Sequence, residues 1–90
     1  MAETPEEVKL TWARGGGAVI LALSEDVITV RSSVAYPPGA RVEGALESGR
    51  AMKMKVHGSK RQDDGSFVIS GRPIDLLREV REEVQARLIR

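Results

Sequence analysis

The hydrophobic pattern of this chain changes its period once, and this change constrains the fold more than any other feature. Up to Ser70, short runs of apolar and polar residues alternate with a period of two, which is typical of half-buried strands. From Pro73 onward, apolar residues recur at spacings of three and four, which is typical of an amphipathic helix. The sequence therefore predicts a mainly β fold that ends in one helix.

Six short strands are expected before the helix. The clearest is "AMKMKVH", residues 51–57, in which apolar side chains alternate with Lys53, Lys55 and His57. Turns such as "RGGG", "YPPGA" and "QDDGS" separate the strands. The other strands are expected at residues 8–13, 18–23, 27–33, 41–46 and 67–70. The core candidates of the second hairpin are Leu21, Leu23, Ile28 and Val30.

The expected helix begins at Pro73, which suits the first helical position because proline lacks a backbone N–H. Asp75 would complement the helix dipole, and Arg78 with Glu82 would form an i,i+4 pair. The apolar face would consist of Ile74, Leu77, Val80, Val84 and Leu88. Six strands and one helix without an internal repeat indicate a small six-stranded antiparallel β-barrel closed by a C-terminal α-helix.

Length and composition allow one modest core, so we expect a single domain at residues 8–90 after a flexible tail at residues 1–7. The formal net charge of +1 provides no global field that would attract nucleic acid or an anionic membrane. The chain has no cysteine, its N-terminus is acidic, and its longest apolar run, "AVILAL", is far shorter than the roughly 20 residues of a membrane span. A cytoplasmic location without membrane insertion is therefore expected.

Catalytic chemistry finds little support in the sequence. His57 is the single histidine, has no cysteine or second histidine as a partner, and is expected at the surface. No serine lies in a nucleophile-elbow pattern, and neighbouring acids such as Glu25 and Asp26 are typical of solvated turns. We therefore expect neither an enzyme nor a bound metal or other cofactor.

The only dense basic segment is "KMKVHGSKR". Lys53, Lys55 and His57 share one strand face, and Lys60 and Arg61 follow in the expected turn, so this segment could contact an acidic protein or a nucleic-acid backbone. No aromatic residue lies among these cations to stack on bases. A solvated outer face is the simpler interpretation. A second candidate interaction surface is the exposed helix face, Arg78, Glu82 and Glu83.

The order of elements and several local strings resemble the PilZ domain. Founding members of this bacterial family act in type IV pilus biogenesis, and other members bind cyclic di-GMP. "AVILALSEDVITVRSS" resembles the hairpin with the family's second motif, and "YPPGARVEGAL" resembles its proline-glycine loop and following strand. "KMKVHGSKRQDDGSFVIS" and "PIDLLREVREEV" resemble the last hairpin and the closing helix. The resemblance extends from about Val8 to Leu88.

The nucleotide-binding motifs of the family are degenerate in this chain. Binding members carry R-x-x-x-R before the hairpin and D/N-x-S-x-x-G within it. The second motif falls on residues 22–27, where Ser24 matches, Ala22 replaces the acid or amide, and Val27 replaces the glycine. The first motif is missing, and neither Ala nor Gly can replace the charge-assisted contacts of an arginine pair. The resemblance therefore implies a PilZ-like domain that does not bind cyclic di-GMP.

The resemblance and the lost motifs together imply a non-enzymatic adaptor that acts through protein–protein interaction. The processes implied are bacterial motility, by type IV pili or gliding, and cell polarity. Two alternatives stay open. One is a PilZ-type cyclic di-GMP receptor with a non-standard basic site. The other is a small barrel that binds single-stranded nucleic acid, which the near-neutral charge and the three aromatic residues disfavour.

Overall fold

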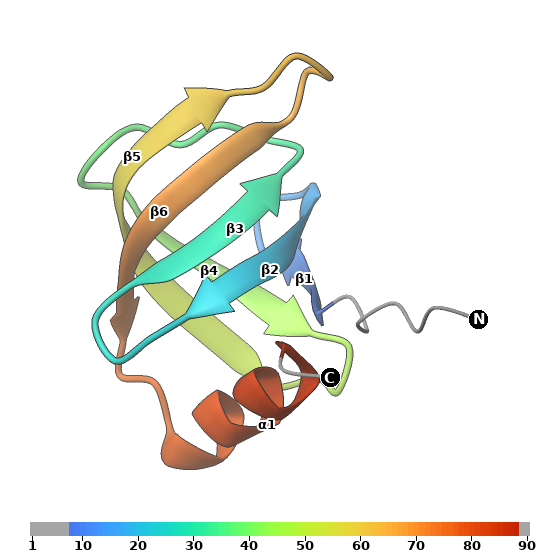
Figure 1. Ribbon diagram of the computed structural model, residues 1–90, viewed down its shortest axis with the longest axis vertical. Coiled ribbons are helices and arrows are strands. Elements are labelled where there is room, and N and C mark those ends of the chain that lie inside the picture. The colour runs from blue at the N-terminus through green and yellow to red at the C-terminus, as the bar shows by residue number, and fades with distance from the viewer. Residues whose placement is uncertain (1–7, 89–90) are drawn as a thin grey trace.

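The computed structural model describes residues 8–88, in which six antiparallel strands form a closed barrel and one helix follows (Figure 1). The predicted fold class is thereby confirmed. Residues 1–7, the predicted tail, and residues 89–90 lie outside the described part of the chain. The elements are β1 (Val8–Trp12), β2 (Gly17–Leu23), β3 (Ile28–Ser32), β4 (Arg41–Leu46), β5 (Ala51–Arg61), β6 (Phe67–Ile74) and α1 (Arg78–Leu88).

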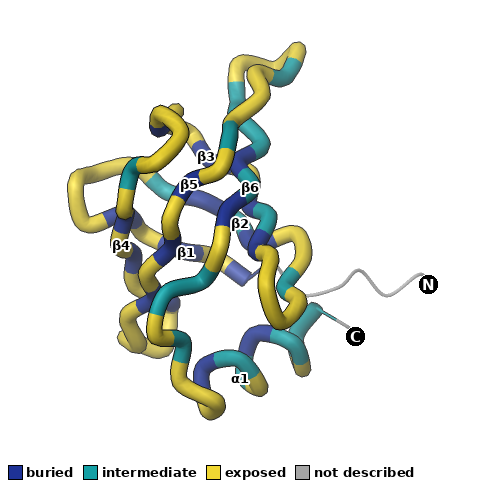
Figure 2. Tube along the Cα trace, turned by 90° about the vertical axis from the view of Figure 1, so that its left-hand side faces the viewer, coloured by how far each residue is buried: buried dark blue, intermediate teal, exposed yellow. Residues whose placement is uncertain are grey.

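The strands follow the order β1-β2-β3-β6-β5-β4 around the barrel, and β4 closes the wall by pairing with β1. Buried and exposed residues alternate along β4 and the first half of β5, as the period-two pattern predicts (Figure 2). The inward side chains form one core that is almost entirely aliphatic. Its most deeply buried large members include Ile20, Ile28, Val30, Ile69 and Val84.

A buried polar contact fastens the loop after β3 to the core. The Trp12 indole N–H donates to the Ser32 hydroxyl at 2.8 Å, and that hydroxyl donates to the Val34 carbonyl at 2.7 Å. The Tyr36 ring packs edge-on against the Trp12 ring, with 5.4 Å between centroids. Two of the three aromatic residues are therefore used to hold this loop against the barrel.

Two strands, β2 and β5, each contain a β-bulge that the alternation of apolar and polar residues did not predict. In β2, Ala18 and Ile20 face the core, so alternation itself places Leu21 outside, and the bulge between Ile20 and Ala22 then brings Leu23 opposite Ile28, where it packs half-buried against the core. In β5 the bulge lies between Val56 and Gly58, and the strand continues to Arg61. Lys60 and Arg61 are therefore strand residues, although a turn was expected at both positions.

The helix boundary predicted at Pro73 is wrong. β6 continues through Pro73 to Ile74, and α1 begins at Arg78. The side chain of Leu77, expected on the buried face, is 65% exposed. Asp75 lies in the connection with a positive φ of 47° rather than near the helix dipole.

The helix lies across one end of the barrel and is held there by apolar and polar contacts (Figure 1). Val80 and Val84 are buried, as the helical spacing predicts. The Arg81 guanidinium donates to the Ser24 carbonyl at 2.7 Å and to the Glu25 carbonyl at 3.2 Å. These bonds join the helix to the β2–β3 turn.

Candidate interaction face

The charges of this chain are segregated between its elements. The six strands hold eight Lys and Arg residues and a single carboxylate, Glu43. The other carboxylates of the described residues lie in turns, connections and the helix. The wall of the barrel is therefore strongly basic, even though the net charge of the whole chain is only +1.

Strand register brings three of these cations into one row across the outer surface. Arg41 on β4 lies opposite Lys55 on β5, and Lys55 lies opposite Arg72 on β6. Like charges directly opposite each other destabilise a sheet. Within residues 8–88, none of these three side chains forms a hydrogen bond or ion pair. We call Arg41, Lys55 and Arg72 the basic row.

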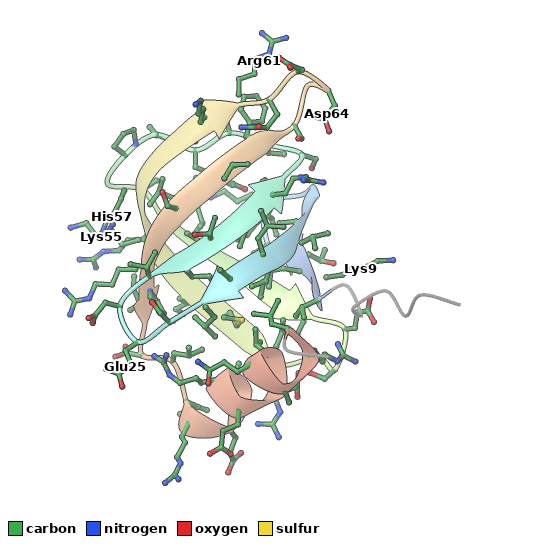
Figure 3. All side chains as sticks on the ribbon, in the orientation of Figure 1. Lys9, Glu25, Lys55, His57, Arg61 and Asp64 are labelled. Atoms are coloured by element: carbon green, nitrogen blue, oxygen red, sulfur yellow. The ribbon has the colours of Figure 1, made fainter. Side chains whose placement is uncertain are left out.

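Lys53 and His57 lie on either side of Lys55 along β5. Lys53 is opposite Glu43, so its charge has a neighbour of opposite sign. His57 is the extra residue of the β5 bulge, and its side chain is exposed. Lys55 and His57 project from the same side of the barrel, whereas Lys9 lies on the opposite side (Figure 3). The basic row with Lys53 and His57 is called the basic face.

Two adjoining hollows lie beside the basic row, where β6 leaves the barrel towards the helix. The larger, of about 350 Å³, is lined by Arg41, Glu43, Lys53, Ile74 and Asp75. The smaller, of about 130 Å³, shares Lys53, Ile74 and Asp75 with it. The smaller also touches Ala51, Met52, Leu76 and Leu77, and is called the apolar hollow.

Carboxylates lie near both ends of the β5–β6 pair, which carries most of the basic face. Asp64 lies at the tip of the β5–β6 hairpin, where the hydroxyl and N–H of Ser66 donate to it at 2.6 and 2.9 Å. These hydrogen bonds hold the pKa of Asp64 below its ordinary value, so its carboxylate stays ionised to a lower pH than that of a free aspartate. Asp75 lies at the other end. On β5, Lys60 and Arg61 lie between His57 and the hairpin tip, so Asp64 does not border the basic face directly.

The degenerate motif lies in a turn whose serine hydroxyl and backbone carbonyls are already paired. Ser24 accepts the Val27 N–H on its hydroxyl at 3.2 Å, and the Ser24 N–H donates to the Val27 carbonyl at 2.9 Å. Arg81 occupies the carbonyls of Ser24 and Glu25. Ala22 and Val27 are exposed and offer no side-chain donor. The turn therefore presents few free groups to a ligand.

The second candidate surface, the helix face, is divided by its contacts. Arg78 and Glu82 form the predicted i,i+4 pair at 3.0 Å, and both are largely exposed. Glu83 was expected on the same exposed face, but it accepts from Ser48 at 2.8 Å and lies 3.5 Å from Arg50. Glu83 therefore helps to hold the helix against the β4–β5 turn and is not a free surface residue.

Sequence reasoning found part of the basic face and missed the rest. It named Lys53, Lys55 and His57, which the structure brings together on one surface. Arg41 and Arg72 were missed because only the pairing of β4, β5 and β6 places them beside Lys55. The exposure of Leu77 could not be anticipated while Leu77 was assigned to the buried face of the helix.

Comparison with protein-family models, curated proteins and solved structures finds no match to this chain. Among residues 8–88, no group of three or more His, Asp or Glu side chains is arranged to hold a metal ion. The described helix is too short and too polar to cross a membrane.

Proposed function

We propose that this chain is a non-enzymatic, PilZ-like adaptor domain whose basic face binds an acidic segment of another protein. The observation that carries the proposal is the basic row, three adjacent cations whose side chains have no partner among residues 8–88. Such a row costs stability in the isolated domain, and a bound carboxylate-rich segment would remove that repulsion. The resemblance to PilZ domains supports a cytoplasmic role in bacterial motility or cell polarity.

An acidic protein segment fits the basic face better than single-stranded nucleic acid does. Proteins that bind single strands combine cations with aromatic side chains on which bases stack. Here Trp12 and Tyr36 are buried and Phe67 is half-buried, so the basic face has no stacking platform. Glu43 and Asp75 at the margin would also repel a phosphate backbone that continued past the basic row.

The same surface fits cyclic di-GMP poorly. Two guanine rings and two phosphates need directed donors and concentrated charge at one place. The motif turn uses its polar groups internally, and the basic row lies on strands with no aromatic neighbour. An acidic protein segment needs only a row of cations along an extended surface, and the basic row across β4, β5 and β6 provides one.

A direct test uses three probes with the purified full chain. These are a fluorescein-labelled peptide of alternating glutamate and glycine, a fluorescein-labelled oligothymidylate and cyclic di-GMP. We expect saturable binding of the peptide in fluorescence anisotropy, weakening as salt is raised. For cyclic di-GMP, isothermal titration should give flat heats.

The variant Lys55→Glu should abolish peptide binding, because it breaks the basic row at its centre. Lys9→Glu makes the same charge change on the opposite side of the barrel and should leave binding nearly unchanged. Equal losses in both variants would contradict a defined face. Tighter binding of the oligonucleotide than the peptide would favour the nucleic-acid alternative, and saturable one-site heat with cyclic di-GMP would favour the receptor alternative.

A further inference from the structure

The stability of the fold does not explain why a leucine occupies position 77. Its side chain is 65% exposed, more than any other exposed large apolar residue of the described chain. Its carbonyl accepts the Arg81 N–H at 3.0 Å, so Leu77 occupies the N-cap position of α1. Ser, Thr, Asp and Asn are favoured there because their side chains accept a backbone N–H, which leucine cannot do. Leu77 therefore neither caps the helix nor fills the core.

The backbone before Leu77 turns this side chain away from the core. Asp75 is the one non-glycine residue with a positive φ among residues 8–88, at 47°. This left-handed conformation is accessible to aspartate but disfavoured for most residues. Leu76, immediately after the turn, packs against the core, whereas Leu77 stays exposed. A local rule broken without a structural gain is typical of a functional position.

The apolar hollow beside Leu77 has the size of one large side chain. Its volume is about 130 Å³, and Met52, Ile74 and Leu76 contribute to its lining. A buried apolar cavity of about 150 Å³ is large enough to hold benzene. Lys53 lines both this hollow and the larger one, so the hollow is continuous with the basic face.

We propose that the acidic partner segment carries a large apolar residue that docks in the apolar hollow against Leu77, while neighbouring carboxylates contact the basic row. This inference rests on the proposed function. Charge determines which partner residue lies where. Asp75 at the hollow repels a carboxylate, whereas Lys55 and Arg72 of the basic row attract one. Same-face residues of a strand are about 6.6–6.8 Å apart, so an extended segment would separate its acidic and apolar residues by two or four positions.

The test compares two fluorescein-labelled peptides that differ at one position. Both consist of glutamate and glycine and carry glycine four positions from the central glutamate, on the same face of an extended chain, and in the second peptide that single glycine is leucine. Burying a leucine side chain should strengthen binding to the wild-type chain by about tenfold or more. In Leu77→Ser this enhancement should fall to about twofold, while binding of the glutamate-glycine peptide stays as in wild type.

Leu77→Ser also separates function from folding, because serine is a favoured N-cap residue. Its thermal midpoint should equal or exceed that of wild type. Leu21→Ser is the matched control, since Leu21 is exposed on β2 and does not line the hollow; it should keep the enhancement. Equal binding of the two peptides by the wild type, or full enhancement in Leu77→Ser, would overturn this inference alone. If neither peptide binds, the proposed function fails with it.

Discussion

At the scale of single residues, Ser32 has the most demanding environment. Among residues 8–88 it is the only polar side chain in the buried class. Its hydroxyl accepts the Trp12 indole N–H and the Val34 N–H, and donates to the Val34 carbonyl. All hydrogen-bonding groups around it are thereby satisfied, which is the condition for burying a polar network without a large penalty.

Replacing Ser32 by alanine should lower the free energy of unfolding by about 1–3 kcal/mol, because the buried indole N–H would lose its acceptor. Urea denaturation followed by circular dichroism measures this change. Ser33→Ala is the control, since the Ser33 hydroxyl contacts Gly17 at an exposed position where water can substitute. If both variants lost a similar free energy of unfolding, the Trp12–Ser32 hydrogen bond would contribute no more than the exposed Ser33 contact.

Residue-scale prediction from sequence succeeded where alternation was regular and failed at the bulges. Val42, Gly44, Leu46, Met52, Met54 and Val56 are buried as expected. The expectation for Leu21 was wrong because Ala18 and Ile20 face the core and alternation places Leu21 outside, whereas Leu23 reaches the inner face because a bulge adds one residue before it. The same effect in β5 places Lys60 opposite Val68 on the outer surface. Hydrophobic alternation alone does not locate such insertions.

At the scale of elements, Pro73 was the misleading signal. Proline fits the first turn of a helix, but it also fits a strand position that lacks a neighbour on one side. β3 pairs with β6 only as far as Gly71, so Pro73 lies beyond the paired region on that side. Strand pairing decides between these two uses of proline, and pairing is a long-range property.

The corrected helix boundary changes the expected effect of truncating helix residues. Val84 is fully buried, so Val84→Ala should lower the free energy of unfolding by about 2 kcal/mol through lost burial and a residual cavity. Leu77→Ala should change it by no more than about 0.5 kcal/mol, because that side chain is mostly exposed. Thermal and urea denaturation of both variants checks this order. A reversed order would place the helix differently on the barrel.

The sheet should become more stable when the basic row is interrupted. In Lys55→Glu, a carboxylate replaces a cation between Arg41 and Arg72, so two repulsive cross-strand pairs become attractive. Each pair contributes roughly 0.2–1 kcal/mol, and the urea midpoint should therefore rise at low salt. Lys9→Glu provides the comparison on β1. A lower midpoint for Lys55→Glu would mean that the lysine contributes more through its aliphatic stem than it costs through its charge.

At the scale of the whole molecule, net charge conceals the feature most relevant to binding. A value of +1 suggests no attraction for anionic partners, yet the strands carry most of the cations and the turns most of the described carboxylates. The sequence could indicate Lys53, Lys55 and His57 as one group because they are neighbours on one strand. Arg41 and Arg72 are distant in sequence, and only closure of the barrel brings them to the same surface.

That closure also sets how the chain must fold. Four strand pairs join neighbours in sequence, but β1 must find β4 and β3 must find β6 before the wall is complete. Such distant pairings slow folding to the millisecond-to-second range. Trp12, the single tryptophan, pairs with Gly44 across the β1–β4 seam and bonds to Ser32 on β3. Its fluorescence in a stopped-flow refolding experiment should therefore change in the millisecond-to-second range and report the closure of the barrel.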